Sequence, residues 1–488
     1  MTAPVAHPDL LFIDGEWVSP STSKTIDVID SSTEELYFRV AEAQAEDMDR
    51  AVTAARKAFD EGPWPFMTHA ERAEHMRRFG KELAARGEAL ADIWPRESGI
   101  LAKITKRMAA GMGAVFDYYA DLAATYPFEE RAQPTSGGSF GLLVREPVGV
   151  VGAIIPWNSP LSLAVYKIAP AFLAGCTVVL KTSPEAPGAG LLLAEAAEAA
   201  GLPAGVLNVL TADREVSEKL VTDPRVDKIA FTGSTAAGRR IASLCGERIA
   251  RYTLELGGKS AAVILDDADL NAAAMQIAGA ECMISGQVCS SLTRLVVPRN
   301  KHDEFVDALA GVFGQVVVGD PFDPASQMGP LAMERQRDKV LDLIAAGKSE
   351  AKLVTGGGKP AHLEKGYYIE PTVFAEVENS MTIAREEIFG PVLSVIPAAD
   401  EAEAIRIAND SIYGLNASVF TADPDRARAV AARLRSGTVG HNGFRTDFGI
   451  AFGGFKQSGI GREGGLEGLL PYLETKTIVL DETPSSYA

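Results

Sequence analysis

The chain has 488 residues, of which 47% are hydrophobic and 23% are charged, and its formal net charge at pH 7 is −18. The composition is typical of a globular protein, and at about 150 residues per domain the length predicts roughly three domains. Because a negative surface repels nucleic acid and anionic lipid, we expect no nucleic-acid partner and no membrane partner.

The start of the chain and its cysteines bear on the compartment. The first residues contain no basic segment followed by a long apolar run, and no stretch approaches 18 apolar residues. The four cysteines show no CxxC spacing, are too few for a disulfide framework and form no cluster with the six histidines. We therefore expect a cytoplasmic protein without a metal site.

Predicted strands and helices alternate from Pro147 onward. Strands are predicted by the β-rich runs 148–155, 177–181, 206–210, 228–233, 252–256 and 261–265. Helices are predicted between them, near 160–174, 187–200, 214–221 and 235–246. This alternation is typical of βαβ units, and it predicts a parallel sheet that helices cover on both faces.

A second α/β block begins near Gly257. A strand at 292–298, a helix at 303–314 and a strand at 391–397 repeat the same alternation. The sequence therefore predicts two α/β lobes.

Residues 126–146 differ from both lobes, because they consist of two extended runs about a Ser-Gly-Gly turn with no helix between them. We expect a hairpin that projects from the sheet. The β-prone run 472–480 near the end of the chain can pair with such a hairpin of this chain or of another. Exposed strand edges of this kind favour a homodimer or a homotetramer.

Cys289 is the cysteine with the most informative surroundings. It lies in the polar, glycine-containing segment Ser285-Gly-Gln-Val-Cys289, between a predicted helix and a predicted strand, where catalytic groups are often held. Cys176, Cys245 and Cys282 lie among apolar residues and are interpreted as small core residues. On its spacing alone, Cys289 fits a core position as well as a catalytic one.

Two polar residues follow predicted strands of the first lobe. Glu255 ends an apolar strand and is followed by two glycines, which let another group approach the backbone; its alternative is a surface carboxylate paired with Lys259. Asn158 follows the strand 148–155 at the carboxyl edge, where open parallel sheets bind ligands. Its alternative is the N-cap of the helix that starts at Pro160.

Two glycine patterns carry no phosphate-binding prediction. Gly459, Gly461 and Gly464 satisfy GxGxxG, but no apolar strand precedes them. Residues 233–238 resemble the front of a phosphate loop, but arginines stand where Lys and Ser/Thr are required.

Six motifs together closely resemble the NAD(P)-dependent aldehyde dehydrogenase superfamily, over nearly the whole chain and in the order that the superfamily shows. They are Ile155-Pro-Trp-Asn158, Phe231-Thr-Gly-Ser234, Leu254-Glu-Leu-Gly-Gly-Lys259, Gly286-Gln-Val-Cys289, Glu387-Ile-Phe-Gly-Pro391 and Phe452-Gly-Gly-Phe-Lys456. The resemblance implies an aldehyde dehydrogenase-like α/β fold with four parts: a Rossmann-like cofactor domain (1–125 and 147–256), an α/β catalytic domain (257–455), a helical return segment (456–473) and a small β oligomerisation segment (126–146 and 474–488).

The resemblance also implies a reaction, the oxidation of an aldehyde to the carboxylic acid. The Cys289 thiolate attacks the carbonyl, and the oxyanion faces the Asn158 amide and the Cys289 backbone N–H. After hydride transfer, water activated by Glu255 hydrolyses the thioester. Lys167 and Glu463 match positions that pass the Glu255 proton to solvent. Acyl transfer to coenzyme A is the enzymatic alternative, which the presence of Glu255 disfavours; a non-catalytic member of the fold is the other.

NAD is the cofactor that the resemblance implies, with NADP accepted as well. Lys181 matches a ligand of the adenosine ribose, and Glu387 and Phe389 match positions at the nicotinamide end. Ser234 stands at a helix N-terminus, which offers free N–H groups to a pyrophosphate. The remaining predicted cofactor-binding residues are Ile154, Ile155, Pro156, Trp157, Ser183, Gly233 and Leu256.

One departure from the family pattern concerns cofactor choice. NAD-selective relatives commonly carry glutamate three residues after the lysine, and here that position is Pro184. Glu185 can substitute only if it folds back, so we expect weak discrimination between NAD and NADP. Leu163, Tyr166 and Phe452 suggest an apolar tunnel, which favours aliphatic, aromatic or terpenoid aldehydes over semialdehydes.

Overall fold

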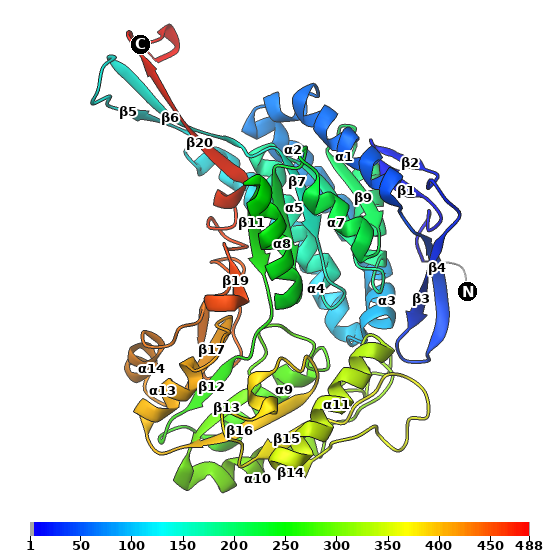
Figure 1. The fold of residues 1–488 in the computed structure, drawn as a ribbon, viewed down its shortest axis with the longest axis vertical. Helices are drawn as coiled ribbons and strands as arrows, with labels where there is room; N and C mark the ends of the chain where they lie inside the picture. Colours follow the sequence, from blue (N-terminus) through cyan, green and yellow to red (C-terminus); the bar gives the residue numbers. More distant parts are fainter. Residues whose placement is uncertain (1–3, 488) are drawn as a thin grey trace.

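An eight-stranded sheet forms the first lobe of the computed structural model, which describes residues 4–487 (Figure 1). Its inner strands β11, β10, β7, β8 and β9 are parallel, and β19, β1 and β2 pair antiparallel at the two edges. In sheet order the strands are β19 (Gly459–Ile460), β11 (Arg251–Glu255), β10 (Lys228–Thr232), β7 (Val150–Ile154), β8 (Thr177–Thr182), β9 (Leu207–Thr211), β1 (Leu11–Ile13) and β2 (Glu16–Val18).

Helices cover both faces of this sheet, as predicted, because successive strand residues face opposite sides. In β7, Val151 and Ala153 pack into one apolar core, and Val150 and Ile154 pack into another. The first core lies against α2 (His69–Ala85), α3 (Gly87–Ser98), α4 (Ala102–Thr125), α5 (Pro160–Ala174) and α6 (Gly188–Ala199). The second lies against α1 (Ala45–Asp60), α7 (Arg214–Thr222) and α8 (Thr235–Arg248).

Helix α5 has the bounds that the sequence predicts. Pro160 occupies the first turn, where its missing N–H costs no hydrogen bond, and Gly175 ends the helix in the left-handed region at φ 98°. Local start and stop signals therefore define this helix without help from tertiary contacts.

The second lobe is a seven-stranded sheet, again covered on both faces. In sheet order its strands are β14 (Lys352–Thr355), β15 (Thr372–Ala375), β16 (Val392–Ala398), β13 (Arg294–Pro298), β12 (Ala261–Ile264), β17 (Asn416–Phe420) and β18 (Thr438–His441). The helices are α9 (Leu270–Cys282), α10 (His302–Phe313), α11 (Glu334–Glu350), α12 (Thr382–Arg385), α13 (Glu401–Asn409) and α14 (Pro424–Ala431).

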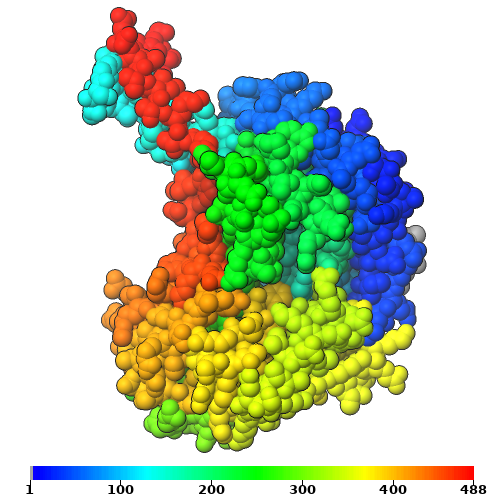
Figure 2. Space-filling model, in the orientation of Figure 1, coloured from blue at the N-terminus to red at the C-terminus, as the bar shows by residue number. Residues whose placement is uncertain are grey.

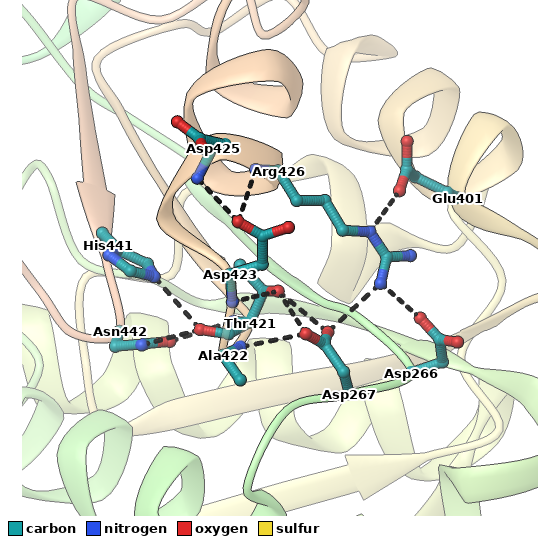
Figure 3. A network of polar contacts seen from close by, with 10 residues as sticks. All are labelled: Asp266, Asp267, Glu401, Thr421, Ala422, Asp423, Asp425, Arg426, His441 and Asn442. Atoms are coloured by element: carbon teal, nitrogen blue, oxygen red, sulfur yellow. Dashed lines mark hydrogen bonds and ion pairs between the residues drawn. The ribbon is translucent and has the colours of Figure 1, made fainter.

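A network of charged side chains closes the carboxyl edge of the second sheet (Figure 3). Arg426 in α14 contacts Asp266 at 2.7 Å, Glu401 at 2.9 Å and Asp267 at 3.2 Å. The Asp267 carboxylate also accepts the Thr421 hydroxyl at 2.7 Å. The carboxylates of Asp266, Asp267, Glu401 and Asp423 are thus partnered by the arginine or by neighbouring donors.

The predicted hairpin and the strand near the end of the chain form an arm that projects from the first lobe (Figures 1 and 2). It consists of β5 (Glu129–Ala132), β6 (Phe140–Pro147) and β20 (Leu473–Leu480). β20 pairs antiparallel with β6 of the same chain, from Leu473 opposite Pro147 to Leu480 opposite Phe140. Of the two partners that the sequence left open, this chain's own hairpin is the one observed.

The predicted helical return segment 456–473 is wrong in its secondary structure. It contains two short 3₁₀ turns, Lys456–Ser458 and Leu470–Tyr472, and the strand β19. Gly459, Gly461, Gly464 and Gly465 all have positive φ, between 55° and 150°. The chain therefore runs as an irregular path, and β19 pairs with the end of β11 beside Glu255.

Elements before α1 complete the fold. Besides β1 and β2, these are the hairpin strands β3 (Thr25–Asp30) and β4 (Glu35–Ala41). Residues 1–3 of the predicted cofactor domain and residue 488 of the predicted oligomerisation segment lie outside the described residues. Between residues 4 and 487, no helix is both long enough and apolar enough to cross a membrane.

Candidate active site

A cavity of about 190 Å³ lies at the carboxyl edge of the first sheet and is lined by residues of both lobes. It brings together most of the residues that the motifs single out. The lining residues are Pro156, Trp157, Asn158, Leu163, Thr232, Gly233, Ser234, Glu255, Leu256, Gly257, Cys289, Gln336, Lys339, Glu387 and Phe389.

Cys289 lies on a loop that is packed tightly against its neighbours. Gly286 has φ 72°, and a side chain there would collide with the backbone of Gly390. A side chain at Gly258 would collide with the carbonyl oxygen of Cys289. Burial raises the pKa of the Cys289 thiol to about 12, and the nearby carboxylates of Glu387 and Glu255 act in the same direction. The thiol is therefore protonated at neutral pH and needs a base.

The other three cysteines, Cys176, Cys245 and Cys282, are buried at no more than 4% exposure, which confirms their interpretation as core residues.

Asn158 is held against the nucleophile loop. Its side-chain Nδ2 donates to the carbonyl of Gln287 at 2.9 Å, and its own carbonyl accepts from the Trp94 indole at 3.1 Å. The N-cap of α5 is Ser159, so the alternative that Asn158 caps this helix is wrong. Because an amide carries two N–H groups, one remains for a ligand in the cavity.

Glu255 is buried at the end of β11 without a hydrogen bond to either carboxylate oxygen. The alternative of a pair with Lys259 is wrong, because the buried Lys259 amine also has no hydrogen-bond partner. Burial raises the pKa of Glu255 well above its usual value, and the charge of Glu463 raises it further, whereas Lys167 and Arg462 oppose the shift. Burial therefore favours the neutral acid form of Glu255, which can act as a base only after it loses its proton.

Lys167 and Glu463 form an ion pair behind the cavity wall. The Lys167 Nζ lies 2.5 Å from the Glu463 carboxylate and 2.5 Å from the Thr232 hydroxyl, and both charged side chains are buried. Thr232 itself lines the cavity. The pair therefore reaches the cavity through a hydroxyl that the motif analysis did not assign.

The helix N-terminus at Ser234 opens into the cavity. Ser234 is the N-cap of α8, and its hydroxyl accepts the Ala237 N–H at 3.2 Å. Gly233 precedes it and donates to the Glu255 carbonyl at 3.0 Å. Free N–H groups in the first turn of a 14-residue helix suit the negative charge of a pyrophosphate.

Glu387 and Phe389 stand on the opposite side, in the second lobe. The Glu387 carboxylate accepts the Gly258 N–H at 2.9 Å, and a side chain at Gly257 would collide with that carboxylate. Phe389 adopts φ 61°, rare for a bulky residue, and its ring lies edge-on to Trp157 at 5.4 Å. A bulky aromatic residue in a rare backbone conformation beside a cavity indicates that the cavity is shaped to bind a ligand.

Gln336 and Lys339 hold this strained segment, and the motif analysis missed both. Gln336 donates to the Phe389 carbonyl at 2.8 Å, and Lys339 donates to the Glu387 carbonyl at 2.8 Å. Both residues lie on α11, which carries no recognisable motif, so no local signal could have found them.

Lys181 and Ser183 lie at the end of β8, outside the cavity lining. Burial lowers the pKa of Lys181 to about 8, and the charge of Glu185 opposes this. The Ser183 hydroxyl donates to the Glu185 carboxylate, which also contacts Arg335 at 2.5 Å. Glu185 thus folds back over Ser183 despite Pro184.

The predicted residues Ile154 and Ile155 contribute backbone to the same edge. Ile154 pairs with Lys181 in the sheet, and the Ile155 N–H donates to the Lys181 carbonyl at 3.2 Å. Together the groups at this edge fit a dinucleotide: they are a lysine, a helix N-terminus, a buried carboxylate and two aromatic rings.

The sequence matches the model of the aldehyde dehydrogenase family over residues 17–478. It is 45% identical over 471 residues to geranial dehydrogenase of Castellaniella defragrans, covering 96% of this chain and 98% of that one. It is 40% identical over 480 residues to the chloroplastic betaine aldehyde dehydrogenase of Amaranthus hypochondriacus, covering 96% of each.

Solved structures agree. A Mycobacterium tuberculosis aldehyde dehydrogenase complexed with NAD⁺ has a TM-score of 0.95 at 45% identity, covering 99% of this chain and 100% of that one. A mutant of aldehyde dehydrogenase C from Pseudomonas syringae, complexed with NAD⁺ and octanal, has a TM-score of 0.93 at 41% identity, covering 99% of both.

Proposed function

The chain belongs to the aldehyde dehydrogenase family, and from this premise we propose that it oxidises an apolar aldehyde to the carboxylic acid with NAD, using Cys289 as nucleophile and Glu255 as base. The observation that carries the proposal is the buried Glu255 carboxylate, which has no hydrogen bond and lines the same cavity as the Cys289 thiol. A buried carboxylate without a hydrogen-bond partner costs stability. Its presence in the cavity therefore indicates a chemical role.

The residues act in two stages. In the first, the Cys289 thiol loses its proton to solvent, the resulting thiolate adds to the aldehyde carbonyl, and the oxyanion faces the free N–H of Asn158 and the backbone N–H of Cys289. One such donor is typically worth about 2.7 to 4 kcal/mol in the transition state. When bound by the residues of the sheet edge, NAD would supply the hydride acceptor, and oxidation of the thiohemiacetal would leave a thioester on Cys289.

In the second stage, ionised Glu255 takes a proton from water, which hydrolyses the thioester. The proton then leaves toward the Lys167–Glu463 pair, whose charges already act on Glu255. Acyl transfer to coenzyme A and a non-catalytic role are not favoured, because the base, the nucleophile and the oxyanion donor are all present.

Apolar substrates are supported by a stack of three aromatic rings, of which Tyr166 lies on α5, the helix that also carries Leu163. Tyr166 stacks on Phe448 at 4.2 Å between ring centroids, and Phe448 stacks on Phe452 at 4.4 Å. Leu163 continues the apolar surface into the cavity. Such rings attract hydrocarbon through burial of apolar area.

A substrate panel with NAD tests the proposal. We expect geranial and octanal to be oxidised to their acids with kcat/KM at least about tenfold above that of betaine aldehyde, since the rings reward hydrocarbon. Equal or better use of betaine aldehyde would contradict the apolar assignment. Formation of an acyl-coenzyme A instead of the free acid would contradict the hydrolytic step.

We also propose a homodimer or homotetramer that works in the cytoplasm. All of β5 is exposed, and Val479 and Leu480 at the arm's far end are 51% and 36% exposed, which favours cover by another subunit. The free cysteines support a reducing compartment.

Light scattering tests the oligomer, and the molecular mass that it measures should be at least twice 51.7 kDa. A chain lacking residues 474–488 should give a lower mass or aggregate; an intact monomer in both cases would contradict the oligomer.

A further inference from the structure

Lys228 is a buried lysine to which the catalytic scheme gives no role. It starts β10 and is 1% exposed. Its Nζ donates to the Thr253 hydroxyl at 3.2 Å and lies 5.0 Å from the centre of the Tyr472 ring. A protonated lysine has three N–H donors, so one hydrogen bond leaves it under-satisfied in its charged form.

The sheet connects Lys228 with the cavity. Side chains two residues apart on a strand share a face, so Lys228, Ala230 and Thr232 of β10 point to the same side. On β11, Thr253 lies opposite Ala230 and Glu255 lies opposite Thr232. The side chains of Glu255 and Thr232 at the cavity, and of Thr253 and Lys228 farther along the strands, therefore lie on the same face of the sheet.

The charge of Glu463 acts both on Glu255 at the cavity and on Lys228. One carboxylate oxygen pairs with Lys167, and the other is buried without a hydrogen-bond partner. Burial lowers the pKa of Lys228 to about 7; the charges of Cys176, Glu463 and Cys245 raise it, and that of Lys167 lowers it.

The remaining group that faces the amine is the phenol of Tyr472, which burial keeps protonated because it raises the pKa well above the usual value. Lys228 is thus poised to exchange a proton near neutral pH.

We propose that Lys228 is a positioning residue that stores the proton which Glu255 must release before it can act as a base. The inference rests on the proposed function. The O–H bond of the Glu255 carboxylic acid breaks and an N–H bond forms on Lys228, with the unpartnered oxygen of Glu463 as the intermediate acceptor.

Charge balance is the physical reason. Ionising Glu255 alone adds a net negative charge to a buried cluster, which is costly in a medium of low dielectric constant. If Lys228 takes the proton, the total charge of Glu255, Glu463, Lys167 and Lys228 stays the same. The base is then generated without a buried net charge.

The test replaces Lys228 by methionine, which has similar length and no charge. Lys228→Met should keep the rapid NADH burst within about twofold, because acylation uses Cys289, and should slow steady-state turnover about tenfold at pH 7. The acid limb of the deacylation pH profile should move up by about one pH unit. Hydrolysis of p-nitrophenyl acetate without NAD gives the same profile independently of the cofactor.

Thr253→Val is the matched control, because it removes the hydrogen bond and keeps the amine; its acid limb should stay within about 0.3 pH unit of wild type. Lys228→Gln is the second variant if methionine does not fold. An unchanged acid limb in a folded variant, an equal loss of burst and steady state, or unfolding of both Lys228 variants would overturn the proposal. A wild type that makes no acid would instead overturn the proposed function.

Discussion

The two parallel sheets end in polar groups that are arranged in opposite ways. At the first sheet, Glu255 is buried with neither oxygen hydrogen-bonded. At the second sheet, Arg426 pairs with Asp266, Asp267 and Glu401, so each of these acids has a positively charged partner (Figure 3). Both edges have a cavity, of about 190 Å³ and about 270 Å³ respectively.

A cavity at the carboxyl edge of a parallel sheet therefore does not by itself identify a catalytic site. Paired charges at the second edge stabilise the fold. Buried groups without partners at the first edge destabilise it, and they are available for substrate and proton transfer. The comparison predicts large losses of activity at the first edge and none at the second.

The largest effect is expected for Cys289→Ala. Turnover should fall by at least about a thousandfold, because no other nucleophile replaces the thiol, while NAD binding measured by calorimetry should be retained. Cys282→Ala is the control, since this cysteine packs in a core and should keep most activity. A variant at position 289 with a tenth of wild-type turnover would exclude it as the nucleophile.

Glu255→Gln should lower steady-state turnover about a hundredfold or more and leave the NADH burst, because water needs the base more than the aldehyde does. Stopped-flow absorbance separates the two phases. A slower burst with normal thioester hydrolysis would show that Glu255 serves only acylation. Another group at the first edge would then have to act as the base for hydrolysis.

Cofactor choice should show an intermediate effect. Glu185 contacts Ser183 and pairs with Arg335, so a carboxylate stands near Lys181, but Arg335 partly neutralises it. We expect kcat/KM to favour NAD over NADP by less than roughly 150-fold, which corresponds to about 3 kcal/mol. Glu185→Gln should reduce this preference. A wild-type preference above a thousandfold, or one for NADP, would contradict the expectation.

The pH dependence should follow from the raised pKa values at the first edge. Burial raises the pKa of both Cys289 and Glu255 and so favours their protonated, inactive forms. The reactive thiolate and carboxylate become more populated as pH rises, and kcat should increase about tenfold between about pH 6 and 9. A profile that falls over this range would mean that bound ligands reverse the shifts.

The smallest effect on activity is expected for Arg426→Met at the second edge. Activity should stay within about twofold of wild type, because the arginine touches no cavity group of the first edge. Partly exposed ion pairs each contribute about 0.2 to 1 kcal/mol, so the melting temperature should fall by a few degrees. A loss of activity without a loss of stability would give the second edge a function.

The sequence predicts elements well where local signals suffice. Helix α5 follows from Pro160 and Gly175, and apolar runs predict the parallel strands β7 to β11 of the first lobe and β12, β13 and β16 of the second, but not β14, β15, β17 and β18. The return segment 456–473 fails, because its pairing with β11 depends on contacts that are distant in sequence. The same division holds in the site. Motif residues at strand ends are predictable, whereas Lys339 on α11 becomes relevant only through its contact with the Glu387 carbonyl, 48 residues away in sequence.

The central claim is that the first edge forms a thioester on Cys289 which Glu255 then releases. The direct measurement is peptide mass spectrometry of Glu255→Gln, quenched in acid after mixing with octanal and NAD. We expect a mass increase of one octanoyl group on the peptide that contains Cys289 and on no other cysteine peptide. Acylation of another cysteine, or full turnover with no acylated peptide, would contradict it.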